Sequence, residues 1–201
     1  MRCIAFVVAL GCSPGFGQNS KEENSGNNLD TNQQDDLFQQ SGLPNVLEGM
    51  DTTYCNTVLD EELGGQDIAG ATSYFTGTYL LDADGWFGRE QWILHPTPAW
   101  TATNGEVCYV TWETSATQVD VAGCADCDLG LSVAANINRQ QTDCPEGLWK
   151  DTEESWEVNY DIKIQGNEAT FYFQESGNVM GYGYSNDTAI NFLTEPSCTW
   201  F

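Results

Sequence analysis

Strict alternation of apolar and polar residues is the feature that most constrains what this chain can fold into. Over 129–137 the odd positions are Leu, Leu, Val, Ala and Ile. Over 156–164 the even positions are Trp, Val, Tyr, Ile and Ile, and the residues between them are polar. A period of two residues places all the apolar side chains on one face of a β-strand. Each segment therefore predicts a half-buried strand.

The clearest hairpin spans 156–174. Gly166-Asn167 suits a two-residue turn, and the alternation resumes after it. Because a slip of one residue would turn every side chain to the opposite face, the register is strongly specified. The pattern predicts that one set faces the core, namely Val158, Tyr160, Ile162, Phe171 and Phe173, and that Glu157, Asp161 and Lys163 face water.

Further strands are indicated over 74–81, 86–94, 107–113, 118–121, 179–184 and 188–193. The turn-forming pairs Asp84-Gly85, Asn104-Gly105, Gly177-Asn178 and Asn186-Asp187 punctuate these segments. No strand–helix–strand alternation is evident, which argues against an α/β fold. We predict one all-β domain over 43–201, an antiparallel meandering barrel or sandwich of eight or nine strands. Its lead-in, 43–73, is expected to hold a short helix near 57–63.

The first twelve residues are typical of an export signal. Arg2 is followed by an apolar run over 3–10 and then by Gly11-Cys12. This order resembles the signal of bacterial lipoproteins, although Ala9 stands where that family usually has a larger aliphatic residue. The resemblance implies a signal peptide over 1–11, an acylated (for example palmitoylated) Cys12 that anchors the chain in a lipid bilayer, and, through Ser13, an outer-membrane location in the cell envelope.

Two alternatives stay open for this segment. The chain could be secreted after cleavage behind Gly17, or the segment could be a cytosolic strand. The run is half the length that a membrane-spanning helix needs. Downstream, 12–42 is rich in Ser, Gly, Asn, Gln, Asp and Glu, a composition that predicts a disordered tether.

Six cysteines remain beyond the signal, and their number suits a disulfide framework in an exported chain. The candidates are Cys55, Cys108, Cys124, Cys127, Cys144 and Cys198, and the sequence does not fix their pairing. Cys124-Ala-Asp-Cys127 also has the spacing of a zinc knuckle, with Cys144 or Cys108 as further ligands, or of a redox-active pair. Structural disulfides are the favoured interpretation.

The chain carries far more negative than positive charge. Thirty acidic residues stand against six basic ones, and Arg2 would leave with the signal. Phosphate backbones would be repelled, so nucleic acid is excluded as a partner. Anionic lipid surfaces are poor partners except through the acyl anchor.

Signals of specific chemistry are few. Asp82-Ala-Asp84-Gly85 resembles the opening of a calcium loop, to which Glu90 could add a ligand, but a hairpin turn is the better interpretation and no cofactor is expected. His95 has no nucleophile at a recognisable spacing. The tryptophans could line a cavity, as in lipocalin-like barrels, although core packing is favoured.

Three cysteine-bearing segments, 104–112, 124–128 and 144–148, together resemble β domains of uncharacterised bacterial envelope lipoproteins. That resemblance implies an envelope location and a disulfide-tied β fold, and no activity. The sequence thus favours an anchored lipoprotein whose acidic domain is a binding or structural module for a protein or small molecule. The alternative is an envelope hydrolase whose carboxylates come together in space.

Overall fold

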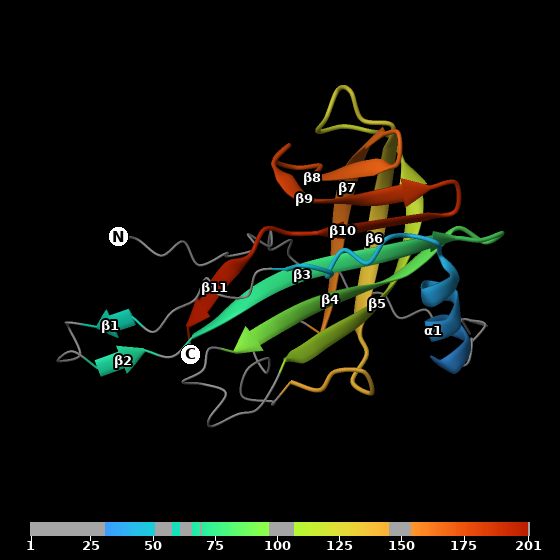
Figure 1. Ribbon diagram of the computed structural model, residues 1–201. Coiled ribbons are helices and arrows are strands. Elements are labelled where there is room, and N and C mark those ends of the chain that lie inside the picture. Colours follow the sequence, from blue (N-terminus) through green and yellow to red (C-terminus); the bar gives the residue numbers. More distant parts are fainter. Residues whose placement is uncertain are drawn as a thin grey trace, which may run out of the picture.

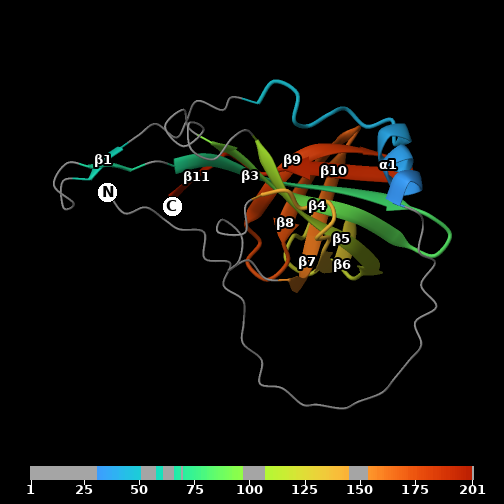
Figure 2. The ribbon, with the colours of Figure 1, turned by 90° about the horizontal axis from the view of Figure 1, so that it is seen from below.

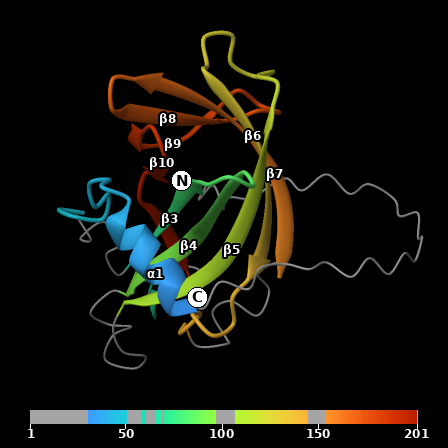
Figure 3. The same cartoon turned by 90° about the vertical axis from the view of Figure 1, so that its right-hand side faces the viewer.

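The computed structural model describes residues 31–50, 58–60, 66–68, 70–96, 107–144 and 154–200. Most of these residues form a single antiparallel sheet whose strands follow one another in sequence order (Figures 1 and 3). The eight strands that make up the barrel are β3 (Gly70–Leu81), β4 (Trp86–Pro96), β5 (Cys108–Val119), β6 (Leu129–Ile137), β7 (Ser155–Gln165), β8 (Glu168–Phe173), β9 (Val179–Asn186) and β10 (Ala189–Leu193).

Pairing of the last barrel strand with the first closes the sheet. Strand β10 lies antiparallel to β3, from Ala189 opposite Leu80 to Leu193 opposite Thr76. The other seven pairings of the barrel join strands that are neighbours in sequence. The all-β prediction is therefore confirmed, and of its two alternatives the structure is the meandering barrel.

Among the described residues, three short strands lie outside the barrel. Strand β11 (Ser197–Trp200) pairs with the beginning of β3, whose edge it shares with β10. Strands β1 (Val58–Asp60) and β2 (Gln66–Ile68) form a separate hairpin. The helix predicted near 57–63 is thus wrong over Val58–Asp60, where pairing with β2 outweighs the weak local preference. Strand β11 is too short to give a period-two signal, and the sequence did not predict it.

The segments 107–113 and 118–121 were predicted as two strands, but they belong largely to the single strand β5. The polar run between them hides this continuity. Thr114 and Ala116 are buried, whereas Ser115 and Thr117 are exposed, so the alternation persists through the run. Val121 lies beyond the end of the strand.

The 156–174 hairpin forms in the predicted register. Ile162 lies opposite Phe171, and Gly166, with φ of 67°, begins the two-residue turn. Tyr160, Ile162 and Phe171 are buried, and Val158 and Phe173 pack against the same core while partly exposed.

Asp161 departs from the prediction because it is fully buried although it lies on the outer face of the sheet. The loop after β5 covers it and donates three backbone N–H groups to its carboxylate. The nitrogens of Ala122, Gly123 and Cys124 lie 3.2, 2.6 and 2.9 Å from Oδ2. The side chain of Gln174 also donates, with Nε2 2.8 Å from Oδ1. A two-residue period fixes the face of a side chain, but it does not show which loop will cover that face.

Helix α1 (Thr31–Gln40) occupies the last part of the predicted tether and packs against the outside of the barrel (Figures 2 and 3). Its Asp35 accepts an ion pair from Arg89 of β4, with Oδ1 2.8 Å from Nη1. The Arg89 guanidinium also lies 4.7 Å from the centre of the Phe38 ring. These contacts give an acidic, polar segment a fixed place, so the tether prediction does not hold for residues 31–40. No helix among the described residues is long and apolar enough to cross a membrane.

The hairpin register gives a first test. Phe171 is completely buried and contacts the rings of Tyr79, Tyr160 and Phe192. We expect Phe171→Ala to lower the free energy of unfolding by about 3–5 kcal/mol, because it leaves a cavity in the barrel core. The matched change Lys163→Ala, on the outer face of the same hairpin, should stay within about 0.5 kcal/mol. Urea titration of both variants measures the difference, and equal losses would contradict the register.

Candidate functional site

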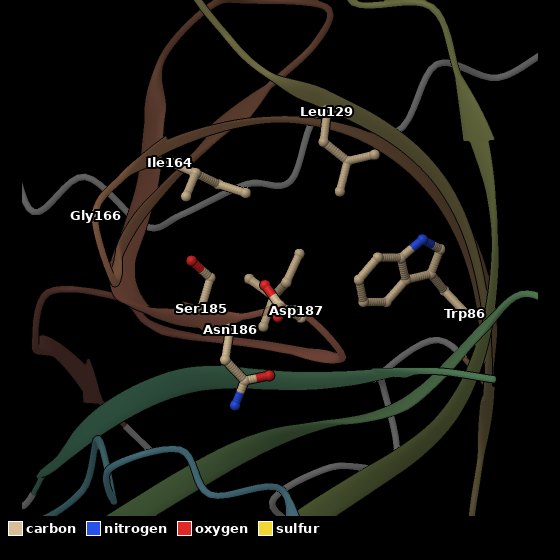
Figure 4. A pocket seen from close by; sticks show the side chains of 8 residues that line it. Trp86, Leu129, Ile164, Gly166, Ser185, Asn186 and Asp187 are labelled. Carbon is tan, nitrogen blue, oxygen red and sulfur yellow. The ribbon is translucent and has the colours of Figure 1, made fainter.

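One end of the barrel carries a cavity of about 290 Å³. Trp86 begins β4, Leu129 begins β6 and Ile164 lies near the end of β7, so the up-and-down topology brings all three to the same end. Their side chains point toward the middle of the opening in Figure 4. Ile190 completes the apolar lining. We call this cavity the barrel mouth.

The turn between β9 and β10 gives the barrel mouth a polar rim. Ser185 and Asp187 contribute to it (Figure 4). Asn186 also borders the cavity, but its side chain is used elsewhere: Nδ2 donates to the Ser41 carbonyl oxygen at 2.9 Å, and Oδ1 accepts from Thr188 N at 3.0 Å. The mouth is therefore apolar within and polar along one side.

Deeper in the barrel lies a fully buried carboxyl group, that of Glu90. Its Oε1 accepts hydrogen bonds from two buried phenols, the Tyr79 hydroxyl and the Tyr160 hydroxyl, the latter at 3.3 Å. Its Oε2 is buried and has no hydrogen-bond partner among the residues that the structure describes. Since Oε1 already accepts two hydrogen bonds, we infer that Oε2 carries the proton when the group is neutral.

Burial dominates the titration of this cluster. Removal from water raises the pKa of Glu90 from 4.5 to about 7, against the opposing effect of the hydrogen bonds from Tyr79 and Tyr160. Burial, reinforced by the neighbouring carboxylate, also raises the pKa of Tyr79 and Tyr160. Both phenols therefore stay protonated and remain donors.

Aromatic rings enclose the Glu90 carboxyl. Phe192 and Phe171 lie 4.5 Å apart between ring centres, and Trp112 and Trp156 lie 4.2 Å apart. Gly77, opposite Glu90 on β3, makes room for this packing, because a Cβ there would lie 2.3 Å from the Phe192 ring. The interior around Glu90 is thus filled by side chains.

The tryptophans divide between packing and cavity lining. Trp112 is buried, and Trp156 and Trp92 pack against the same cluster. Trp86 lines the barrel mouth. Packing is therefore the main role among the tryptophans whose side chains the structure describes, and Trp100, Trp149 and the side chain of Trp200 lie outside that set.

The weak calcium candidates form a turn. Asp82 Oδ1 accepts the backbone N–H groups of Asp84 and Gly85 at 2.8 and 3.1 Å. Glu90 faces the barrel interior, so it cannot join the exposed Asp82 and Asp84 as a ligand. Within the described ranges, no three His, Cys, Asp or Glu residues are grouped to hold a metal ion.

The sulfur atoms of four candidate cysteines form two disulfides, Cys108–Cys144 and Cys124–Cys127. Cys198 is also disulfide-bonded, and Cys55 lies outside the described residues. Cys124–Cys127 closes the loop that covers Asp161, away from any helix N-terminus. The structural interpretation is confirmed for these two pairs, and their sulfurs are not available to zinc in this state.

His95 belongs neither to the barrel mouth nor to the group around Glu90. Its ring lies edge-on to Tyr74, with centres 5.6 Å apart, and partial burial lowers its pKa. The sequence analysis considered Glu90 only as a possible calcium ligand and not as an interior residue. The signal that could have found it is its place in the alternation of β4, in phase with Trp86 and Trp92.

No protein family matches this chain, no curated protein does, and no solved structure does.

Glu90 gives a pH-dependent test. Between pH 4.5 and about 7 the unfolded chain loses this proton while the folded chain keeps it, so stability falls as the pH rises and levels off above about 7. Between pH 5 and pH 8, we expect the free energy of unfolding of the wild type to fall by about 2–3 kcal/mol more than that of Glu90→Gln.

Urea titrations of both proteins at the two pH values measure this. Subtracting the Glu90→Gln result removes the contribution of the carboxylates that the two proteins share. The same pH dependence in both proteins would show that Glu90 is not held neutral by burial.

Proposed function

We propose that this chain is an exported, membrane-anchored binding module that holds a small, mainly apolar ligand at the barrel mouth. The observation that carries the proposal is the convergence of Trp86, Leu129, Ile164 and Ile190 around an open cavity of about 290 Å³. Ligand sites in proteins are typically concave, largely apolar and supplied with a few placed polar groups. The barrel mouth has these properties.

The lining suggests how a ligand would lie. An apolar group would enter between Trp86 and Leu129, and the polar part would stay at the rim beside Ser185 and Asp187. Asp187 disfavours an anionic head group, since like charges repel. The cavity is at the small end of the usual range, and the filled interior below it limits how deep a ligand can go. A neutral or cationic amphiphile fits best.

A binding role is favoured over the hydrolase alternative. A glycosidase-type site needs two carboxyl groups that flank the scissile bond. Asp187 is the one acidic residue among those that line the barrel mouth, and Glu90 is sealed among aromatic rings. The described residues therefore offer the mouth no second carboxyl group.

The anchoring part of the proposal rests on the sequence. Arg2, the apolar run over 3–10 and Gly11-Cys12 support export and acylation at Cys12. Disulfides such as Cys108–Cys144 form and persist in oxidising compartments, which is consistent with export. The partner at this end of the chain would be the lipid bilayer, in the outer membrane of the cell envelope.

Ligand binding is tested with the neutral fluorophore N-phenyl-1-naphthylamine. We expect its fluorescence to rise on binding to wild type, because the apolar lining excludes water from the probe. Leu129→Trp fills the barrel mouth and should weaken binding at least about tenfold. The matched control Val179→Trp places the same bulk on an exposed residue at the opposite end of β9 and should bind as wild type does. Equal binding by both variants would overturn the mouth as the site.

The anchor is tested separately in cells. We expect wild type to incorporate an alkyne-labelled palmitate and to partition into detergent. Cys12→Ala should lose both properties, because the acyl chain has no other thiol at the processed N-terminus. Cys55→Ala serves as the control and should keep the label. Equal labelling of Cys12→Ala and wild type would contradict acylation at Cys12.

A further inference from the structure

A second concave surface lies on the outside of the barrel, away from the mouth. It is a groove of about 600 Å³ between residues 44–48 and the outward face of β8, β9 and β10. Tyr182 and Tyr184 form its floor, so we call it the tyrosine groove. The two residues are two positions apart on β9 and therefore share one face. Tyr182 is 54% exposed, an unusual state for so large a side chain.

Neighbouring strands frame the two tyrosines. Tyr182 lies between Thr170 of β8 and Leu193 of β10. Tyr184 lies between Glu168 and Asn191 in the same way. Residues opposite each other in an antiparallel pair have Cβ atoms about 5 Å apart, so the side chains of Glu168 and Tyr184 leave the sheet next to each other on the same face.

The second wall of the groove is held in place by Asn191. Its Nδ2 donates to the Pro44 carbonyl oxygen at 3.1 Å, and its Oδ1 accepts from Tyr184 N at 2.9 Å. Asn191 is only 4% exposed, so both hydrogen bonds are shielded from water. The segment that follows α1 is thereby fixed along the outside of the barrel (Figure 2), and the groove has a defined width.

Three carboxylates line this groove, those of Glu48, Glu168 and Glu195. None of them forms a hydrogen bond or ion pair with any described residue. Lys163, opposite Thr170 on β7, forms no ion pair with a described residue either. The three carboxylates are not grouped as a metal site. The groove is therefore lined by three carboxylates that no described residue neutralises, together with the two tyrosines.

We propose that the tyrosine groove binds a linear polyamine. Ammonium groups separated by methylene chains match carboxylates that are spaced along a groove, whereas a compact metal ion needs them gathered at one point. The methylene chains would lie on the tyrosine rings, whose faces also attract cations. The net charge of −24 adds a general attraction that raises the local concentration of a polycation.

The test is calorimetric titration of the full-length chain with spermine in 0.15 M NaCl, which screens general charge attraction. We expect Tyr182→Ala and Glu168→Gln each to weaken spermine binding about fivefold, a size set by one cation–π contact or one carboxylate. The matched controls are Tyr172→Ala on the same sheet face and Glu175→Gln on the β8–β9 turn. Neither residue lines the groove, and both variants should bind spermine as wild type does.

Several outcomes would overturn the proposal. Equal weakening by Glu175→Gln and Glu168→Gln would reduce the binding to general charge attraction. Unchanged spermine binding by Tyr182→Ala would show that the tyrosine floor does not contribute to the site. Tighter binding of trilysine or of Mg²⁺ than of spermine would assign the groove to a peptide or a metal ion. Binding of N-phenyl-1-naphthylamine should be unaffected by Tyr182→Ala, which keeps this test independent of the barrel mouth.

Discussion

The pairing of β10 with β3 is the contact on which the rest of the structure depends. It joins Ala189–Leu193 to residues 76–80, more than a hundred positions away in sequence, and it turns a sheet of sequential hairpins into a closed barrel. Closure removes the free edges along that seam. It also gives the inward faces of all eight strands one shared interior. Tyr79 of β3 can then stack on Phe171 of β8, and Glu90 of β4 can meet Tyr160 of β7.

That shared interior explains the state of Glu90. A carboxyl group among aromatic rings can be kept in a barrel only if it is neutral or hydrogen-bonded, and below about pH 7 both conditions apply to Glu90. Two phenols donate to Oε1, and burial raises the pKa of the group to about 7. The consequence is a stability that depends on pH near neutrality, in the interior of a barrel whose mouth is offered to a ligand.

On the outer surface of the barrel, polar side chains hold other segments of the chain in place. Arg89 holds α1 through Asp35 and lies over Phe38, and Asn191 holds the segment at Pro44. Asp161 does the same for the loop that carries the Cys124–Cys127 disulfide. Through these contacts, polar segments of the chain take fixed positions against the outside of the barrel. The tyrosine groove exists because one of these segments, residues 44–48, lies beside β9. The two proposed sites therefore have different origins: the mouth is formed by the barrel, and the groove is formed between the barrel and a segment that packs against it.

Most of the barrel strands, and the faces of their side chains, follow from alternation in the sequence. Alternation with a period of two places Tyr160, Ile162 and Phe171 in the core, and Gly166-Asn167 sets the register of that hairpin. The same alternation was not recognised through the polar middle of β5, and a strand as short as β11 has too few residues to show it. The number and spacing of the cysteines indicated disulfides, but the Cys108–Cys144 pairing depends on the segment after β6 lying along the beginning of β5, where Cys144 N donates to the Tyr109 carbonyl oxygen.

The two candidate sites could not be found without the fold. The barrel mouth joins residues from β4, β6, β7 and β10, and the tyrosine groove joins β8 to β10 with residues 44–48. Asp161 and Glu90 show the physical reason. A local pattern says which face of a strand a side chain occupies, but burial depends on what covers that face: a loop for Asp161, and the far wall of a closed barrel for Glu90. Those contacts join distant parts of the chain, and no period in the sequence encodes them.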